Sequence, residues 1–108
     1  MSRDFRRALR IRPADNVAVA LEDVAAGELV KVEDEGGAFE LEARAAVPFA
    51  HKIALEEIAP GDAILKYEAP IAFATARILP GDWVHAHNAE SYAVAQRLEA
   101  ARSLESCR

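Results

Sequence analysis

The sequence predicts a small, mainly β domain followed by a C-terminal α-helix. Its 108 residues (11.7 kDa) give room for a single hydrophobic core. Apolar and polar residues alternate over residues 39–45, which is the period of a strand with one buried face. A turn motif recurs along the chain, and helical spacing of apolar residues appears only after Asn88.

The chain divides into three predicted segments. Five of the first twelve residues are arginine, which predicts a flexible, solvated arm over residues 1–8, with a docking arm as the alternative. Residues 9–88 carry the β pattern and form the predicted domain. Residues 89–108 form the predicted helix and tail.

Seven short apolar segments predict strands within the domain. They lie near residues 17–21, 29–32, 39–45, 52–55, 63–67, 71–76 and 83–87. Two carboxylates and two glycines at residues 34–37 predict an exposed hairpin loop. Since 24 residues are alanine, the core is expected to be small.

An internal echo predicts that the strands fold back through similar turns. Residues 20–28 recur as 54–62 and more loosely as 74–82, each with a β-branched residue ahead of a glycine. Pro-Gly in the last two copies is typical of a type II turn. The glycines are 34 and then 20 residues apart, which excludes a regular solenoid.

The C-terminal helix is predicted from Val94, Leu98, Ala101 and Leu104, which recur at helical spacing. Its narrow, alanine-rich stripe could pack on the domain, pack on a partner, or fray. Contact with a second copy of the chain is also open. Asn88 directly precedes this helix, so it is either an N-cap or a site residue.

Charge and composition exclude several classes of partner. A net charge of -5 has the wrong sign for neutralising phosphates, so no nucleic-acid partner is expected. No apolar run approaches the ~20 residues needed to span a bilayer, so no membrane partner is expected either. The single cysteine, Cys107, fits a reducing compartment, and we expect a cytoplasmic protein.

The histidines are the clearest candidates for chemistry. His85 and His87 are two apart in a predicted strand. This places both side chains on one face, about 6–7 Å apart at the backbone, together with Trp83. Such a pair can approach one metal ion or one substrate. The alternative is a pair of exposed or structurally hydrogen-bonded imidazoles.

His51 and Lys52 form a second candidate pair. On a strand they face opposite ways unless the chain bends, and Pro48 makes an irregular entry plausible. Together they could bind a carboxylate or transfer a proton. The alternative is an ordinary surface pair.

Several segments combine into a longer pattern over residues 9–88. They are Asp-Asn-Val-Ala-Val-Ala-Leu at 15–21, His-Lys-Ile-Ala-Leu at 51–55, Pro-Gly-Asp at 60–62, Ile-Leu-Lys-Tyr at 64–67, Ala-Thr at 74–75 and Pro-Gly-Asp-Trp-Val-His-Ala-His-Asn at 80–88. In order and spacing they resemble the small SAF-type domain of the altronate and galactarate dehydratase family. That family often has glycines where this chain has Ala50, Glu68 and Ala72.

The resemblance implies a β-clip fold and a lyase. Family members carry this module either ahead of a large catalytic domain or as a separate small subunit, as in sulfolactate sulfo-lyase. Their chemistry is elimination of water or sulfite from a hydroxy acid, commonly with Fe²⁺ or another divalent metal. The chain is then expected to be inactive alone and to need a large dehydratase-like catalytic subunit.

The resemblance also implies roles for five residues at the opening where the two subunits meet. They are catalysis by His51, Lys52 and His87, substrate binding by His85 and Asn88, and metal ligation by His85 and His87. The alternative function is a non-catalytic β-clip module that recognises a small acid or a protein, and self-association is left open by either function.

Overall fold

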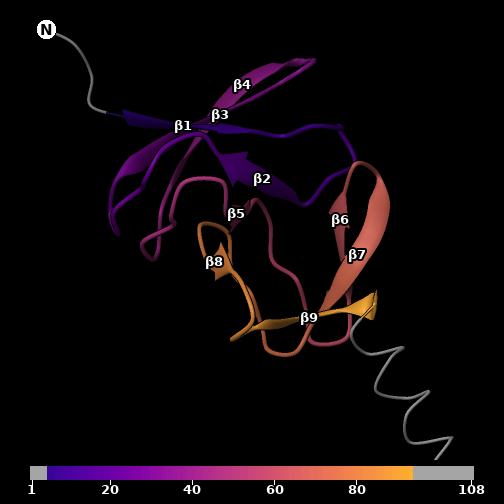
Figure 1. Cartoon of the computed structure of the whole chain (residues 1–108). Helices are drawn as coiled ribbons and strands as arrows, with labels where there is room; N and C mark the ends of the chain where they lie inside the picture. The colour runs from indigo at the N-terminus through magenta and orange to yellow at the C-terminus, as the bar shows by residue number, and fades with distance from the viewer. Residues whose placement is uncertain (1–4, 94–108) are drawn as a thin grey trace, which may run out of the picture.

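The computed structural model describes residues 5–93, which form nine short strands in two sheets (Figure 1). The predicted mainly β fold class is confirmed, and short strands folding back through repeated turns fit a β-clip. Among these residues, no helix is long and apolar enough to cross a membrane.

The larger sheet has six strands in the order β4-β3-β1-β2-β5-β8, and the smaller has three in the order β6-β7-β9. Neighbouring strands are antiparallel except β1 and β3, which are parallel. The strands are β1 (Phe5–Leu9), β2 (Val17–Ala20), β3 (Leu29–Asp34), β4 (Gly37–Glu42), β5 (Lys52–Ala54), β6 (Ala63–Lys66), β7 (Ala69–Ala74), β8 (Trp83–Val84) and β9 (Ala89–Ser91).

Four turns of one shape connect these strands. They span residues 21–28, 44–51, 55–62 and 75–82. The first, third and fourth are the copies of the predicted echo. The second turn is not part of the predicted echo, because Ala50 occupies the position at which the other turns have glycine.

The turns interlock in two pairs through backbone hydrogen bonds. Ala20 precedes turn 21–28, and it accepts a hydrogen bond from the Ala50 N–H and donates one to the His51 carbonyl, both 2.8 Å long, at the end of turn 44–51. Ala43 precedes turn 44–51 and makes the same exchange with Gly27 and Glu28. Turns 55–62 and 75–82 repeat the arrangement. These backbone hydrogen bonds, called the frame below, fix the residue that follows each glycine or Ala50.

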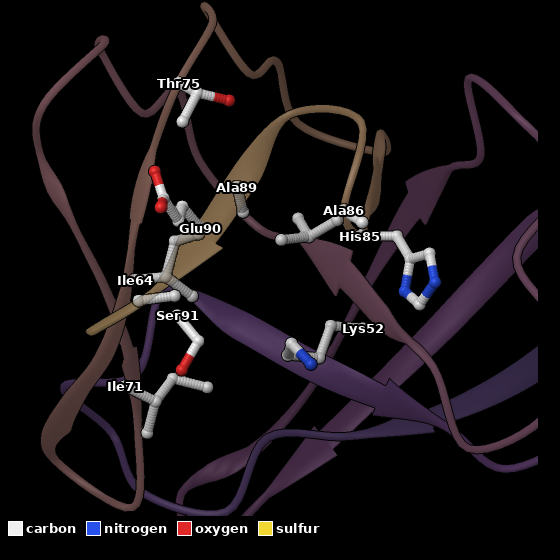
Figure 2. A pocket seen from close by; sticks show the side chains of 11 residues that line it. Lys52, Ile64, Ile71, Thr75, His85, Ala86, Ala89, Glu90 and Ser91 are labelled. Atoms are coloured by element: carbon white, nitrogen blue, oxygen red, sulfur yellow. The ribbon is translucent and has the colours of Figure 1, made fainter. Parts of the chain in front are cut away.

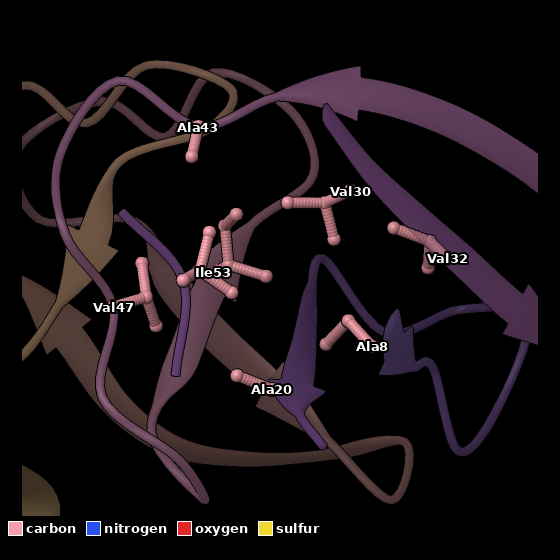
Figure 3. Packing of buried hydrophobic residues seen from close by; sticks show 9 residues of the cluster. Ala8, Ala20, Val30, Val32, Ala43, Val47 and Ile53 are labelled. Carbon is pink, nitrogen blue, oxygen red and sulfur yellow. The ribbon is translucent and has the colours of Figure 1, made fainter. Parts of the chain in front are cut away.

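Two clusters of buried side chains make the core, one under each pair of turns. In the first, Val24 and Val47 face each other across a β-bridge, and Ile58 and Ile78 do so in the second. Figure 3 shows the first cluster, in which small alanines pack between valines and Ile53. The two β-branched positions of each turn pair are thus the centres of the core.

The N-terminal arm over residues 1–8 is a wrong prediction for residues 5–8, which lie in β1 between β2 and β3. Residues 1–4 lie outside the described residues. Arg6 bridges the carboxylates of Glu22 and Glu28, and Arg7 pairs with Glu33, so neighbouring acidic side chains neutralise the basic run.

The predicted strand over residues 39–45 is shorter and more exposed than expected. It ends at Glu42, because Ala43 leads into turn 44–51, and Phe39 on the expected inner face is 37% exposed. The β3–β4 hairpin projects from the rest of the molecule (Figure 1).

The predicted helix does not begin directly after Asn88. Residues 89–91 form β9, which pairs with β7 through Ala72 and Ser91 among others. The rest of that prediction, residues 94–108, lies outside the described residues.

Candidate functional site

The two histidines at 85 and 87 lie in a turn and not, as predicted, in a strand. The strand β8 ends at Val84, and residues 85–88 turn the chain toward β9. Buried Asn88 holds this turn: its Oδ1 accepts a hydrogen bond from the His85 N–H (3.0 Å), and its Nδ2 donates one to the Trp83 carbonyl (2.9 Å). Both ends of the Asn88 side chain are therefore used inside the turn.

The turn nevertheless gathers all three histidines around one tryptophan. The Trp83 ring stacks on His85 with 5.0 Å between centroids and 8° between planes, and it lies 5.2 Å from His87. His51 approaches from turn 44–51, 5.7 Å from Trp83 and 4.9 Å from His85. Trp83 and these three histidines are called the imidazole cluster below.

His51 enters the cluster because of its place in the frame. The matching position in the other three turns holds Glu28, Asp62 or Asp82, and Glu28 and Asp82 accept hydrogen bonds from N–H groups of their own turns. At turn 44–51 an imidazole replaces the carboxylate, and its Nδ1 accepts a hydrogen bond of 3.1 Å from the Trp83 indole N–H. This bond uses the Nδ1 lone pair, so neutral His51 carries its proton on Nε2.

Solvent exposure separates His51 from the other two imidazoles. His85 and His87 are exposed, whereas His51 is half-buried. Within residues 5–93, the ring nitrogens of His85 and His87 form no hydrogen bond. These two side chains can therefore bind a ligand or exchange a proton without breaking a contact of the fold.

Lys52 points into a pocket next to the imidazole cluster (Figure 2), and His51 is not among the residues that line this pocket. The pocket has a volume of about 630 Å³ and lies between β5, β8 and the smaller sheet. Burial, together with the positive charge of Lys66, lowers the pKa of the half-buried Lys52 amine. His85 lines the same pocket and so joins it to the imidazole cluster.

The pocket wall is mainly apolar, with polar groups at a few points. The apolar residues are Ile64, Ile71, Ala72, Val84, Ala86 and Ala89, and the polar ones are Lys52, Thr75, His85, Glu90 and Ser91. Such a mixture is typical of a site that binds a small organic molecule and orients it through a few polar contacts.

Comparison with known proteins places this arrangement in a family. The profile of the altronate/galactarate dehydratase SAF domain matches residues 6–92. The chain belongs to this family.

The relatives of this SAF domain are both long enzymes and separate subunits. Over 80 residues it is 44% identical to the altronate dehydratase of Escherichia coli (strain K12). The aligned segment covers 74% of this chain and 15% of that enzyme. Over 75 residues it is 31% identical to the (2R)-sulfolactate sulfo-lyase subunit alpha of Chromohalobacter salexigens. This aligned segment covers 68% of this chain and 80% of that subunit. The chain thus spans a small part of the first relative and most of the second.

The SAF domain does not by itself provide a full set of metal ligands within residues 5–93. No three His, Cys, Asp or Glu side chains in this part gather so that they could hold one ion. His85 and His87 lie beside the Trp83 ring, and the Nδ1 of His51 is occupied by the indole N–H. A divalent metal at this place would need ligands beyond those that residues 5–93 bring together.

Three polar residues of the pocket were not found from the sequence. The sequence predicts a helix for Glu90 and Ser91, whereas the structure has them in β9, paired with β7 beside the pocket. Thr75 belongs to the motif at 74–75, but it had no chemical role there. An alternation of side chains over residues 89–91 is too short a signal to indicate a strand.

Proposed function

We propose that this SAF domain is the small subunit of a lyase that eliminates water or sulfite from a sugar acid or related hydroxy acid. It would act with a large dehydratase-like catalytic subunit and be inactive alone. The observation that supports this most directly is the imidazole cluster. Its two exposed histidines, whose ring nitrogens form no hydrogen bond with residues 5–93, lie beside a pocket suited to a small molecule.

The reaction needs groups that move protons and stabilise charge. A base must remove the proton next to the acid group, the resulting negative charge must be stabilised, and the leaving group must be protonated or coordinated. The imidazoles of His85 and His87 can accept or donate a proton through their ring nitrogens, and the His51 Nε2–H can donate a hydrogen bond. We assign proton transfer to His87 and substrate orientation to His85 and His51.

Asn88 has a positioning role in this proposal. Its side chain fixes the turn that carries both exposed histidines, and in that conformation it has no free polar end for the substrate. Lys52 contributes from the pocket, which His85 also lines.

The site is completed by the large subunit. The sulfolactate sulfo-lyase relatives are called subunits alpha, and the altronate dehydratases are several times longer than this chain. A divalent metal such as Fe²⁺, if used, would take most of its ligands from the large subunit.

Reconstitution with the large subunit tests the proposal. The chain is purified from its native cell with any large polypeptide bound to it, and elimination from altronate and from (2R)-sulfolactate is measured. We expect activity from the complex only, and His87→Ala should lower kcat by about 100-fold because a positioned proton-transfer group is lost.

The control is Glu57→Gln, an exposed substitution in turn 55–62 that removes an ion pair with Arg77 far from the imidazole cluster. It should leave kcat unchanged. If His87→Ala also leaves kcat unchanged while the complex is active, His87 takes no part in the reaction. If no large polypeptide binds and neither acid reacts, the non-catalytic binding module becomes the better description.

A further inference from the structure

Lys52 differs from the other basic side chains of the described residues in having no partner. Each arginine between residues 5 and 93 forms an ion pair with a carboxylate. Lys31 and Lys66 lie over the rings of Phe5 and Tyr67. Within the same residues, the Lys52 ammonium forms neither an ion pair nor a hydrogen bond.

Its surroundings make this isolation costly. The side chain is half-buried against the apolar wall of the pocket, and the positive charge of Lys66 acts on it unfavourably. A charge without a counter-ion in such a place is unfavourable, and a bound anion would remove the cost.

Glu90 is a second charge in the same pocket that has no ion-pair partner among residues 5–93. It comes from β9, whereas Lys52 comes from β5, and the two do not form an ion pair (Figure 2). Within the described part of the chain the Glu90 carboxylate has no hydrogen-bond donor. The hydroxyls of Ser91 and Thr75 belong to the same pocket.

Two opposite charges that do not meet favour a ligand with two different ends. An acid group fits Lys52, and the Glu90 carboxylate fits hydrogen-bond donors such as hydroxyls. A second acid group near Glu90 would be repelled. Polyanions such as nucleoside triphosphates are disfavoured for the same reason.

We propose that this pocket is the subsite for the acid group of a polyhydroxy acid with a single negative charge, held by Lys52, with its hydroxyls on Glu90 and Ser91. The identification of this ligand as the substrate rests on the proposed function. The pocket itself is built by this chain alone, so binding does not require the large subunit.

Titration of the full chain with three probes tests the proposal. The probes are altronate, which has one acid group, (2R)-sulfolactate, which has two, and altritol, in which a neutral group replaces the carboxylate of altronate. Calorimetry should show saturable binding of altronate, about tenfold weaker binding of (2R)-sulfolactate, and no binding of altritol.

Substitutions assign the binding to the two charges. Lys52→Gln should weaken altronate binding by about tenfold or more, and Lys52→Arg should restore most of it. Lys31→Gln, on β3 and outside the pocket, is the matched control and should bind as the original chain does. Glu90→Gln should bring (2R)-sulfolactate close to altronate in affinity. Because Lys52→Gln removes an unpaired charge, we expect it to fold.

Three results would overturn the proposal: no saturable binding of altronate, equal binding of altronate and altritol, or unchanged altronate binding by Lys52→Gln. Equal affinity for altronate and (2R)-sulfolactate in the original chain would refute the part assigned to Glu90. These failures are distinct from failure of the lyase function, because an active complex with no altronate binding by the small chain rejects only the subsite. Binding by the chain without activity of any complex rejects only the lyase function.

Discussion

Ala50 adopts a left-handed backbone conformation, with φ of 70°, in a place where the other three turns have glycine. The glycines at the matching positions, 27, 61 and 81, have φ of 87°, 89° and 91°. A side chain in this region costs about 1–2 kcal/mol. The chain therefore carries local strain directly before His51.

Ala50→Gly should stabilise the protein by about 1 kcal/mol, because glycine adopts the left-handed backbone conformation of this turn without the steric cost of a side chain. The free energy of unfolding in urea measures the effect. Gly61→Ala is the matched control, because an added Cβ there meets no atom within 4 Å while φ stays positive. It should destabilise by a similar amount. A loss of stability in Ala50→Gly would show that the Ala50 methyl group makes a contact worth more than the strain.

At the scale of single elements, the β6–β7 hairpin depends on a buried carboxylate from outside it. Its two turn residues, Tyr67 and Glu68, both have positive φ (57° and 62°), which is unfavourable for residues with side chains. Asp15 is 3% exposed and accepts hydrogen bonds from both of their N–H groups, at 3.0 and 2.7 Å. Asn16 adds two more bonds, to Leu65 and Ala63 of β6.

Asp15→Ala should destabilise the protein by about 2–3 kcal/mol, since several N–H groups lose their acceptor and the positive φ values are no longer compensated. Amide exchange of Tyr67 and Glu68 should accelerate more than that of β3. Asp23→Ala removes one exposed hydrogen bond to the Phe49 N–H and serves as the control, with an effect below about 1 kcal/mol. Equal effects of the two substitutions would argue against Asp15 as the support of the hairpin.

The elements also show where sequence reasoning succeeds and where it fails. Repeated turns and alternation were enough to predict the strands of the middle of the chain. They missed β1, because its arginines are neutralised by acidic side chains that are distant in sequence, and β9, because three residues carry too little pattern.

The sequence predicted that the three histidines lie together, but the structure brings them together in a different way. His51, His85 and His87 do lie together, but a turn fixed by Asn88 brings them there and not the spacing of a strand. Local spacing alone cannot reveal that Trp83 is the common neighbour of all three. Lys52 lines the pocket and His51 does not, which fits the opposite sides that the strand period predicts for neighbouring residues.

At the scale of the whole molecule, Gly81 joins the two pairs of turns. It is the buried glycine of turn 75–82, and an added Cβ would lie 2.3 Å from the Glu42 carbonyl oxygen. Its own carbonyl accepts a hydrogen bond of 2.9 Å from the Arg44 N–H, and Arg44 also pairs with Asp82. The two halves therefore meet at a contact that has no room for a side chain.

Gly81→Ala should cost about 3 kcal/mol or more, through both the positive φ (+91°) and the overlap with backbone. Gly61→Ala shares only the first of these causes and should cost about 1 kcal/mol. Thermal unfolding of both variants measures the difference. Similar losses would mean that the two pairs of turns move apart easily at Gly81.

The interlocked turns separate what keeps the protein folded from what gives it reactivity. The fold is held by the backbone hydrogen bonds of the alanines and by four buried side chains, those of Val24, Val47, Ile58 and Ile78. His51 takes part in these backbone hydrogen bonds only through its own carbonyl and N–H. Exchange of the His51 side chain should cost the fold about one hydrogen bond, the one from the Trp83 indole N–H, or about 0.5–1.5 kcal/mol. New chemistry could thus arise at such a position by drift, without a compensating change elsewhere.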